Sequence, residues 1–136
     1  MKILIICSKK FYPNIKDIKN ILEKEHEIYL PNCYDAPDTE DKMRKLSAKD
    51  HQEFKAKMFR QSEEVISKMD AVLVLNYDKN NEEKNYIGGA TFLEMYDAFR
   101  LNKKIFLYND IPKGILSDEI KGFNPIIINQ NLTLIK

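Results

Sequence analysis

Five short apolar runs recur along the chain, and segments with helical spacing separate them. Four of the five are rich in Ile, Val and Leu and show little alternation with polar residues. That composition is typical of strands buried on both faces of a parallel sheet. We therefore predict five strands, at Ile3–Cys7, Glu27–Leu30, Ala71–Leu75, Ile105–Tyr108 and Pro125–Ile128.

The segments between these runs predict three helices, each with apolar residues at helical spacing. The first helix, over about 14–24, carries Ile15, Ile18 and Leu22 on one face. The second, over about 48–68, carries Phe54, Met58, Val65 and Met69. The third, over about 90–101, carries Phe92, Tyr96 and Phe99. Residues 31–47 are the least regular stretch, and we expect a solvated loop with a short helix there, with a lid as the alternative.

Strands alternating with helices predict right-handed crossovers and a parallel sheet with helices on both faces. We expect one α/β domain over residues 1–136, a Rossmann-like or flavodoxin-like three-layer sandwich with strand order 2-1-3-4-5. In such sheets ligands bind outside the carboxyl ends of the strands, where the strand order reverses. The pattern thus predicts a site at the ends of the first and third strands.

Composition adds little to this picture beyond exclusions. The chain has a formal net charge of +1, which gives no general attraction to nucleic acid or to a membrane surface. Its two cysteines form no disulfide framework. The apolar run near the N-terminus is too short for a signal peptide or a membrane span. We expect a cytoplasmic protein with neither a nucleic-acid nor a membrane partner.

Several familiar sites are absent from the sequence. It contains no GxxxxGK[ST] phosphate loop and no GxGxxG fingerprint. The only histidines are His26 and His51, and we interpret His51 as a partly buried polar residue on the second helix. We therefore predict neither a metal site nor a bound cofactor.

The most informative segment is Asn85–Ala98, which reads NYIGGATFLEMYDA and opens the third helix. Adjacent glycines, Gly88 and Gly89, allow the backbone to approach a ligand closely and expose helix N–H groups. Glu94 follows within about a turn, and two interpretations of it stay open. Thr91 and Glu94 fit a capping box, in which the glutamate bonds back to the threonine amide. Alternatively, the Glu94 carboxylate faces the ligand site.

The order of motifs resembles the nucleoside 2-deoxyribosyltransferase-like superfamily, which includes deoxynucleoside 5′-phosphate N-hydrolases. The matching segments are the third strand with its approach, Met69–Asn76, the residues Glu94, Met95 and Ala98, the segment Leu101–Ile105, and the turn Ile6–Lys9. The resemblance implies that Glu94 attacks the anomeric carbon of a nucleoside or nucleoside 5′-monophosphate and displaces the base. A carboxylate suits the oxocarbenium-like transition state. The resemblance is also compatible with a homo-oligomer, because family members often complete the pocket with residues from a neighbouring subunit.

The chain departs from the family pattern at two positions where aspartates are usual. It has Asn76 just after the third strand and Gly88 six residues before the glutamate. These departures favour the alternative of a nucleotide-binding or sensing module without catalysis. Asp78 is a candidate substitute for a missing aspartate. An electron-transfer protein of flavodoxin type is a third alternative, which the lysines in the first turn disfavour.

The turn after the first strand completes the predicted site. Ser8 is suited to bonding a sugar or phosphate oxygen, and Lys9 to favouring a 5′-phosphate. Phe11 or, alternatively, Tyr12 is suited to stacking on a base. The predicted catalytic residue is Glu94, and the predicted substrate-binding residues are Ser8, Lys9, Phe11, Asn76, Asp78, Gly88 and Gly89.

Overall fold

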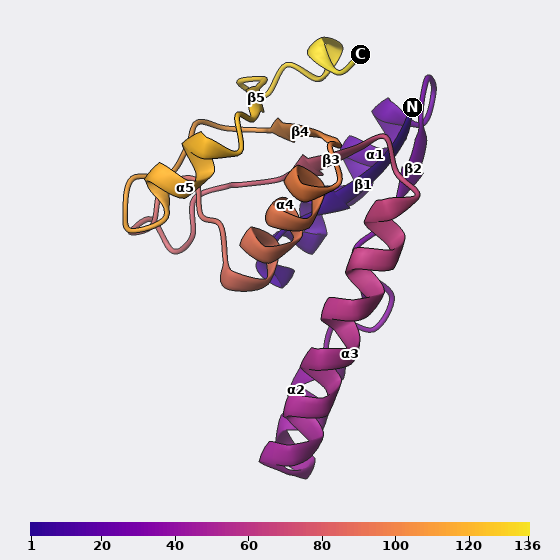
Figure 1. The fold of residues 1–136 in the computed structure, drawn as a ribbon, viewed down its shortest axis with the longest axis vertical. Helices are drawn as coiled ribbons and strands as arrows, with labels where there is room; N and C mark the ends of the chain where they lie inside the picture. The colour runs from indigo at the N-terminus through magenta and orange to yellow at the C-terminus, as the bar shows by residue number, and fades with distance from the viewer.

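The structure is a computed structural model that describes residues 1–136, and a five-stranded parallel sheet forms its centre (Figure 1). Across the sheet the strands run β2-β1-β3-β4-β5, and every neighbouring pair is parallel. The predicted class, strand number and strand order are confirmed. The strands are β1 (Lys2–Ile6), β2 (Glu27–Tyr29), β3 (Ala71–Val74), β4 (Lys104–Leu107) and β5 (Ile126–Ile127).

Helices cover both faces of the sheet and give the molecule three layers. Successive residues of β1 alternate between two cores, with Ile3 and Ile5 in one and Leu4 and Ile6 in the other. Because both faces are buried, the run shows no polar alternation. The first core includes η1 (Lys9–Asn14) and α1 (Ile15–Leu22), and the second includes α3 (Ala48–Ser67), α4 (Gly89–Arg100) and α5 (Ser117–Gly122).

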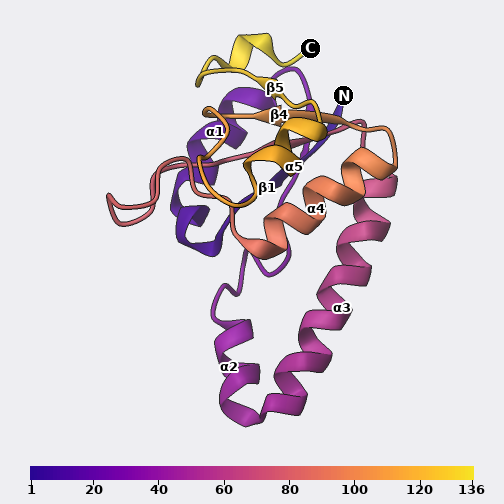
Figure 2. The same ribbon diagram turned by 60° about the vertical axis from the view of Figure 1, so that its left-hand side comes forward.

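A helical hairpin projects from the carboxyl edge of the sheet (Figures 1 and 2). It consists of α2 (Thr39–Leu46) and the first half of α3, which pack side by side. Ser47 separates the two helices and caps α3, because its Oγ accepts a hydrogen bond from the amide of Asp50 at 3.0 Å. The irregular stretch thus contains the expected short helix, and the predicted long helix agrees with α3 to within one residue.

The third predicted helix exists as α4, but its buried face is not the predicted one. Thr91, Met95 and Ala98 face the sheet and are buried, whereas Tyr96 and Phe99 are each 46% exposed. The smaller side chains allow α4 to lie close to the sheet. The aromatic residues of the outer face instead gather around Phe123 at the end of α5, with Phe99 at a centroid distance of 5.5 Å.

Candidate ligand-binding site

A pocket of about 220 Å³ lies at the carboxyl end of β1. It is smaller than the roughly 300–1,000 Å³ of sites for drug-sized ligands. Its walls come from four places: the turn after β1, the loop after β2, the α2–α3 hairpin and the start of α4. The lining residues include Cys7–Lys9, Tyr12, Pro31–Cys33, Glu40, Phe54, Lys55, Met58, Phe59, Ser62, Gly88–Thr91 and Glu94.

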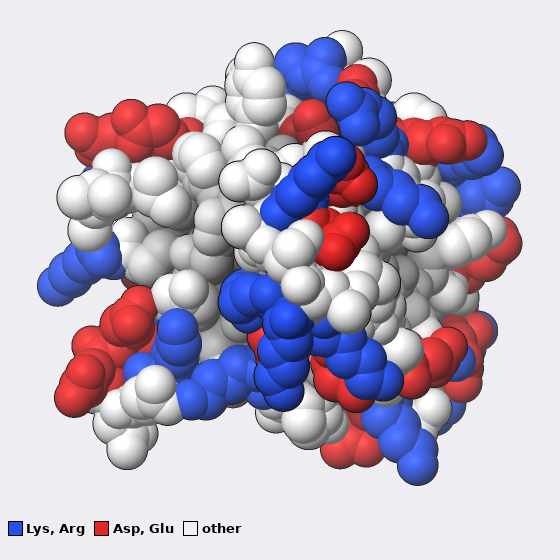
Figure 3. Space-filling view, turned by 90° about the horizontal axis from the view of Figure 1, so that it is seen from below, with Lys and Arg blue, Asp and Glu red and all other residues white.

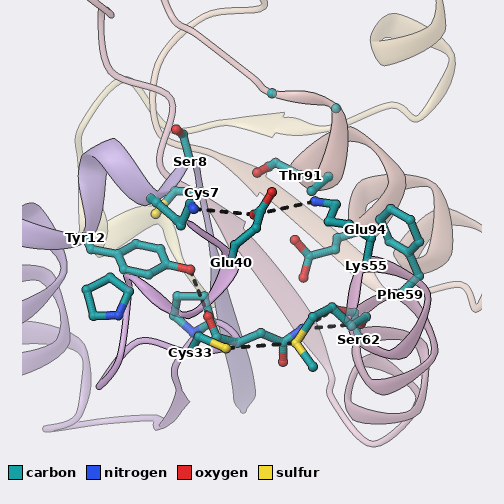
Figure 4. Close-up of a pocket in the computed structure, with 18 of the residues that line it drawn as sticks. Cys7, Ser8, Tyr12, Cys33, Glu40, Lys55, Phe59, Ser62, Thr91 and Glu94 are labelled. Atoms are coloured by element: carbon teal, nitrogen blue, oxygen red, sulfur yellow. Dashed lines mark hydrogen bonds and ion pairs between the residues drawn. The ribbon is translucent and has the colours of Figure 1, made fainter. Parts of the chain in front are cut away.

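Glu94 points into this pocket (Figure 4). The helix α4 begins at Gly89 with Gly88 as its N-cap, so Thr91 is the third helical residue and is buried. Glu94 therefore lies in the second turn of α4. The capping-box interpretation is wrong, because Thr91 does not stand at the cap position.

The surroundings of Glu94 disfavour its ionised form. Burial is the main cause, and together with the charge of Asp97 it raises the pKa of the Glu94 carboxyl to about 7. A hydrogen bond from Ser62 and the charge of Lys55 act in the opposite direction. Ser62 is itself held in place, since its Oγ accepts a hydrogen bond from Asn32 Nδ2 at 2.7 Å. Glu94 thus carries the strongly perturbed carboxyl that is common at functional sites.

Glu40 is the second carboxylate of the pocket, and four cationic or titratable groups surround it. Oε1 lies 3.4 Å from Lys9 Nζ and 3.8 Å from Lys55 Nζ. Oε2 lies 3.0 Å from both Arg44 and His51. Burial acts to raise the pKa of Glu40, but the His51 hydrogen bond and the two lysines outweigh it and lower that pKa to about 2. Glu40 therefore stays ionised at neutral pH and is not a proton donor.

Cys7, one of the two cysteines that line the pocket, is not a nucleophile at neutral pH. Burial, and then the nearby charge of Glu94, raises the pKa of the Cys7 thiol to about 12. A thiol rather than a thiolate is present there, and the thiol is a weak nucleophile. Of the two carboxyl groups in the pocket, Glu40 and Glu94, only Glu94 forms no ion pair.

The structure brings together five of the eight predicted site residues. Ser8, Lys9, Gly88, Gly89 and Glu94 all line the pocket. Ser8 also caps η1, because its Oγ accepts a hydrogen bond from the amide of the second residue of that helix. A Cβ added at Gly89 meets nothing within 4 Å, so this part of the α4 backbone is open to a ligand.

Phe11, Asn76 and Asp78 do not line the pocket. Phe11 is buried in the core, where its ring meets Tyr77 edge-on at a centroid distance of 5.4 Å. The Asp78 carboxylate accepts hydrogen bonds within its own loop, from the Asn85 amide at 3.0 Å and from a lysine.

Asn76 holds the sheet edge together, although we expected it to bind substrate. Its side chain is fully buried, and its Nδ2 donates to the carbonyls of Asn109 and Asp110 at 3.2 and 2.9 Å. Its Oδ1 accepts from the Asn109 amide at 2.8 Å. An ionised aspartate at this position has no N–H to donate to the two carbonyls, so the amide of Asn76 is needed for these hydrogen bonds.

The α2 and α3 residues of the pocket are missing from the predicted site. They are Glu40 of α2 and Lys55, Phe59 and Ser62 of α3, and they reach the pocket only because these helices pack beside it. One sequence signal exists on α3. One face of α3 carries residues at spacings of four, three and four: Lys55, Phe59, Ser62 and Ile66. Ser62 is thus a small polar residue on the same helix face as the buried Ile66.

Together the fold and the pocket define an α/β protein with a pocket at the carboxyl edge of a parallel sheet, where ligands bind in many proteins of this class. Comparison of the chain with protein-family models, with curated proteins and with solved structures finds no match. No group of three His, Cys, Asp or Glu side chains is arranged to hold a metal ion. No helix combines the length and the apolar character needed to cross a membrane.

Proposed function

We propose that this protein cleaves or transfers the N-glycosidic bond of a nucleoside or nucleoside 5′-monophosphate, with Glu94 as the nucleophile. The observation that carries the proposal is the Glu94 carboxyl, which points into a pocket of about 220 Å³ at the carboxyl edge of the sheet. The resemblance found in the sequence implies the same role for Glu94.

In this reaction a carboxylate oxygen of Glu94 forms a bond to the anomeric carbon, and the bond from that carbon to the base nitrogen breaks. The base leaves with the electron pair and takes a proton from solvent. Water then attacks the glycosyl ester and releases the sugar and the carboxylate, or a second base captures the sugar. The buried Met95 and Ala98 pack α4 against the sheet, which keeps the carboxylate in place during both steps.

The rest of the pocket suits the other parts of such a substrate. Ser8 and the open backbone at Gly89 offer hydrogen-bond donors to sugar or phosphate oxygens. Tyr12, Phe54 and Phe59 offer aromatic surfaces for a base. Phe11 offers no such surface, because it is buried in the core.

Base release tests the proposal directly. A panel of nucleosides and nucleoside 5′-monophosphates is incubated with the protein, and the free base is measured by chromatography. We expect release by the unmodified protein and a loss of at least about a hundredfold in Glu94→Gln, as for other groups that act directly on the reacting atoms. Glu64→Gln is the matched control, since Glu64 is an exposed carboxylate of α3 outside the pocket. Release that persists in Glu94→Gln would contradict the assigned role.

The open backbone of α4 gives a second test. Gly89→Ala adds a methyl group to the space beside the pocket and should weaken ligand affinity without unfolding the protein. Gly122→Ala adds the same group at another open position, in α5, and should leave affinity unchanged. Equal affinities of the two variants would show that the ligand does not approach Gly89.

One observation favours a second candidate function, a binding module that holds a nucleotide without cleaving it. Apart from Glu94, the pocket contains one carboxyl, and this group, Glu40, stays ionised in its ion pairs. Asp78 is directed into its own loop. The pocket therefore lacks a second carboxylic acid to protonate the leaving base. Thermal stabilisation by a nucleotide together with no base release would favour this function over catalysis.

A further inference from the structure

Two lysines from distant parts of the chain meet at one carboxylate oxygen inside the pocket. Lys9 comes from the turn after β1 and Lys55 from α3, and both face Oε1 of Glu40, at 3.4 and 3.8 Å. Neither lysine forms another ion pair. Figure 4 shows the Glu40 side chain reaching across the pocket toward Lys55. A single point thus lies within reach of both ammonium groups, and an oxygen atom of α2 occupies it.

Glu40 has other partners that do not depend on these lysines. Its second oxygen, Oε2, lies 3.0 Å from Arg44 and from His51, on the hairpin side of the carboxylate. If Oε1 is displaced, the carboxylate keeps these two partners and is not left as an unpaired charge. Lys55 also lies over the ring of Phe59, at 5.4 Å from its centroid. The contact between Glu40 and the lysines can therefore be exchanged at a low cost.

The charges around Glu40 are not balanced. Three cations, Lys9, Arg44 and Lys55, face only two carboxylates, Glu40 and Asp41, of which Asp41 pairs with Arg44 at 2.5 Å. Among the groups around Glu40 this leaves one positive charge, and the other carboxyl of the pocket, Glu94, lies near Lys55. Figure 3, seen from the end to which the hairpin points, shows acidic and basic side chains interspersed. The surplus is thus local, and it suits a small anion better than a long polyanion.

We propose that Lys9 and Lys55 form an oxyanion subsite of the pocket, which the Glu40 carboxylate occupies and from which a phosphate group of the ligand displaces it. A phosphate oxygen takes the position of Oε1 and gains both ammonium groups, which bind phosphate as point charges. Glu40 acts as an internal competitor, so it lowers the affinity for anions and selects those that carry more charge than a carboxylate.

The subsite lies in the same pocket as Glu94, Ser8 and the start of α4. A nucleoside 5′-monophosphate therefore meets the lysines with its phosphate and Glu94 with its sugar. This statement about the substrate rests on the proposed function, whereas the anion subsite itself does not.

Binding of inorganic phosphate at low salt, measured by isothermal titration calorimetry, tests the subsite. Glu40→Gln keeps the shape of the side chain and removes its charge. We expect this variant to bind phosphate at least about fivefold more tightly than the unmodified protein, the size of one freed ion pair. Asp41→Asn removes a charge from the same helix without facing the lysines and should change the affinity less than about twofold. Equal or weaker binding by Glu40→Gln would overturn the proposal.

A second variant shows whether the added affinity comes from the lysines. In the double variant with Glu40→Gln and Lys55→Met, the gain should disappear. Should Glu40→Gln fail to fold, judged by circular dichroism, Lys55→Met in the unmodified protein takes its place. That variant should bind a nucleoside 5′-monophosphate at least about fivefold more weakly than the unmodified protein does, and the matching nucleoside less than about twofold more weakly. Equal weakening of both ligands would refute the subsite.

The two proposals fail in different ways. Tighter phosphate binding by Glu40→Gln without base release by the unmodified protein supports the subsite and removes the catalytic function. Base release that depends on Glu94, without any gain of phosphate affinity in Glu40→Gln, supports the catalytic function and removes the subsite.

Discussion

Replacing Glu94 by glutamine removes an ionisable group whose charged form is disfavoured by burial in the pocket. Glutamine has nearly the same shape and keeps a carbonyl oxygen that can accept the hydrogen bond from Ser62. What changes is the charge. The variant therefore separates the cost of ionising Glu94 in the pocket from the packing of its side chain.

The size of this cost follows from the raised pKa. The Glu94 carboxyl changes from its ordinary pKa of 4.5 to about 7 in the folded protein. Each pH unit corresponds to about 1.4 kcal/mol, so ionisation costs the folded state at most about 3 kcal/mol. The neutral form stabilises the fold fully below pH 4.5, and this stability is lost as pH rises through about 7. Glutamine never ionises, so the Glu94→Gln variant keeps this stability at higher pH.

Urea unfolding followed by far-ultraviolet circular dichroism measures the difference. Glu94→Gln should match the unmodified protein near pH 4.5 and exceed its free energy of unfolding by up to about 3 kcal/mol near pH 8. With a urea dependence of roughly 1–3 kcal/mol per molar, the midpoint shifts by about 1–3 M. Glu64→Gln gives the effect of losing an exposed carboxyl, which is subtracted. A difference that does not change between these pH values would refute the burial argument.

Three further predictions concern the residues around the site. Asn76→Asp should lower the free energy of unfolding by at least about 2 kcal/mol in urea titrations, since the buried amide loses its donors to two carbonyls; an equally stable variant would contradict this. Glu40→Gln should cost about 2 kcal/mol at neutral pH. Because the pKa of Glu40 is lowered to about 2 in the folded protein, this loss should disappear as pH falls from 4.5 through about 2. A loss of stability that stays constant in urea titrations across that range would contradict the ion-pair argument. Met95→Ala should cost about 2–5 kcal/mol by the same method, because Met95 is fully buried under α4, and a loss below about 1 kcal/mol would place α4 away from the sheet.

The sheet could be predicted from sequence because both of its faces are buried. A strand such as β3 then consists of apolar residues alone, and its run ends where the chain leaves the core. The order of elements along the chain adds the topology, since crossovers between parallel strands have one hand. These rules depend on local pattern and connectivity, and they required no knowledge of which side chains meet.

The buried face of α4 could not be predicted in the same way. Hydrophobicity alone favours Tyr96 and Phe99 as core residues, yet the sheet accepts the smaller Thr91 and Ala98. The choice depends on how closely the helix can approach β3 and β4, which is a property of packing. Asn76 shows the same limit, because its three hydrogen-bond partnerships join segments 33 and 34 residues apart.

The hairpin contribution to the pocket depends on tertiary structure even more. Glu40 stands in an acidic, irregular stretch, where one carboxylate looks like the others. Its distinction is that Lys9, 31 positions away, and Lys55, 15 positions away, meet it in space. Ion pairs between solvated side chains leave no periodic pattern in a sequence. A prediction from sequence therefore found the lysine of the turn but not the carboxylate and the second lysine that face it.

The two interpretations of Glu94 differ only in where the helix begins, and that is why packing decides between them. A start at Thr91 would place Glu94 at the third helical position, where it can bond back to the cap. Burial of Thr91, Met95 and Ala98 against the sheet requires Thr91 to be inside the helix, so the N-cap of α4 is Gly88, three residues before Thr91. Glu94 then lies beyond the reach of the cap and on the side of the pocket. The same packing that hides Thr91 thus exposes the carboxylate to a ligand.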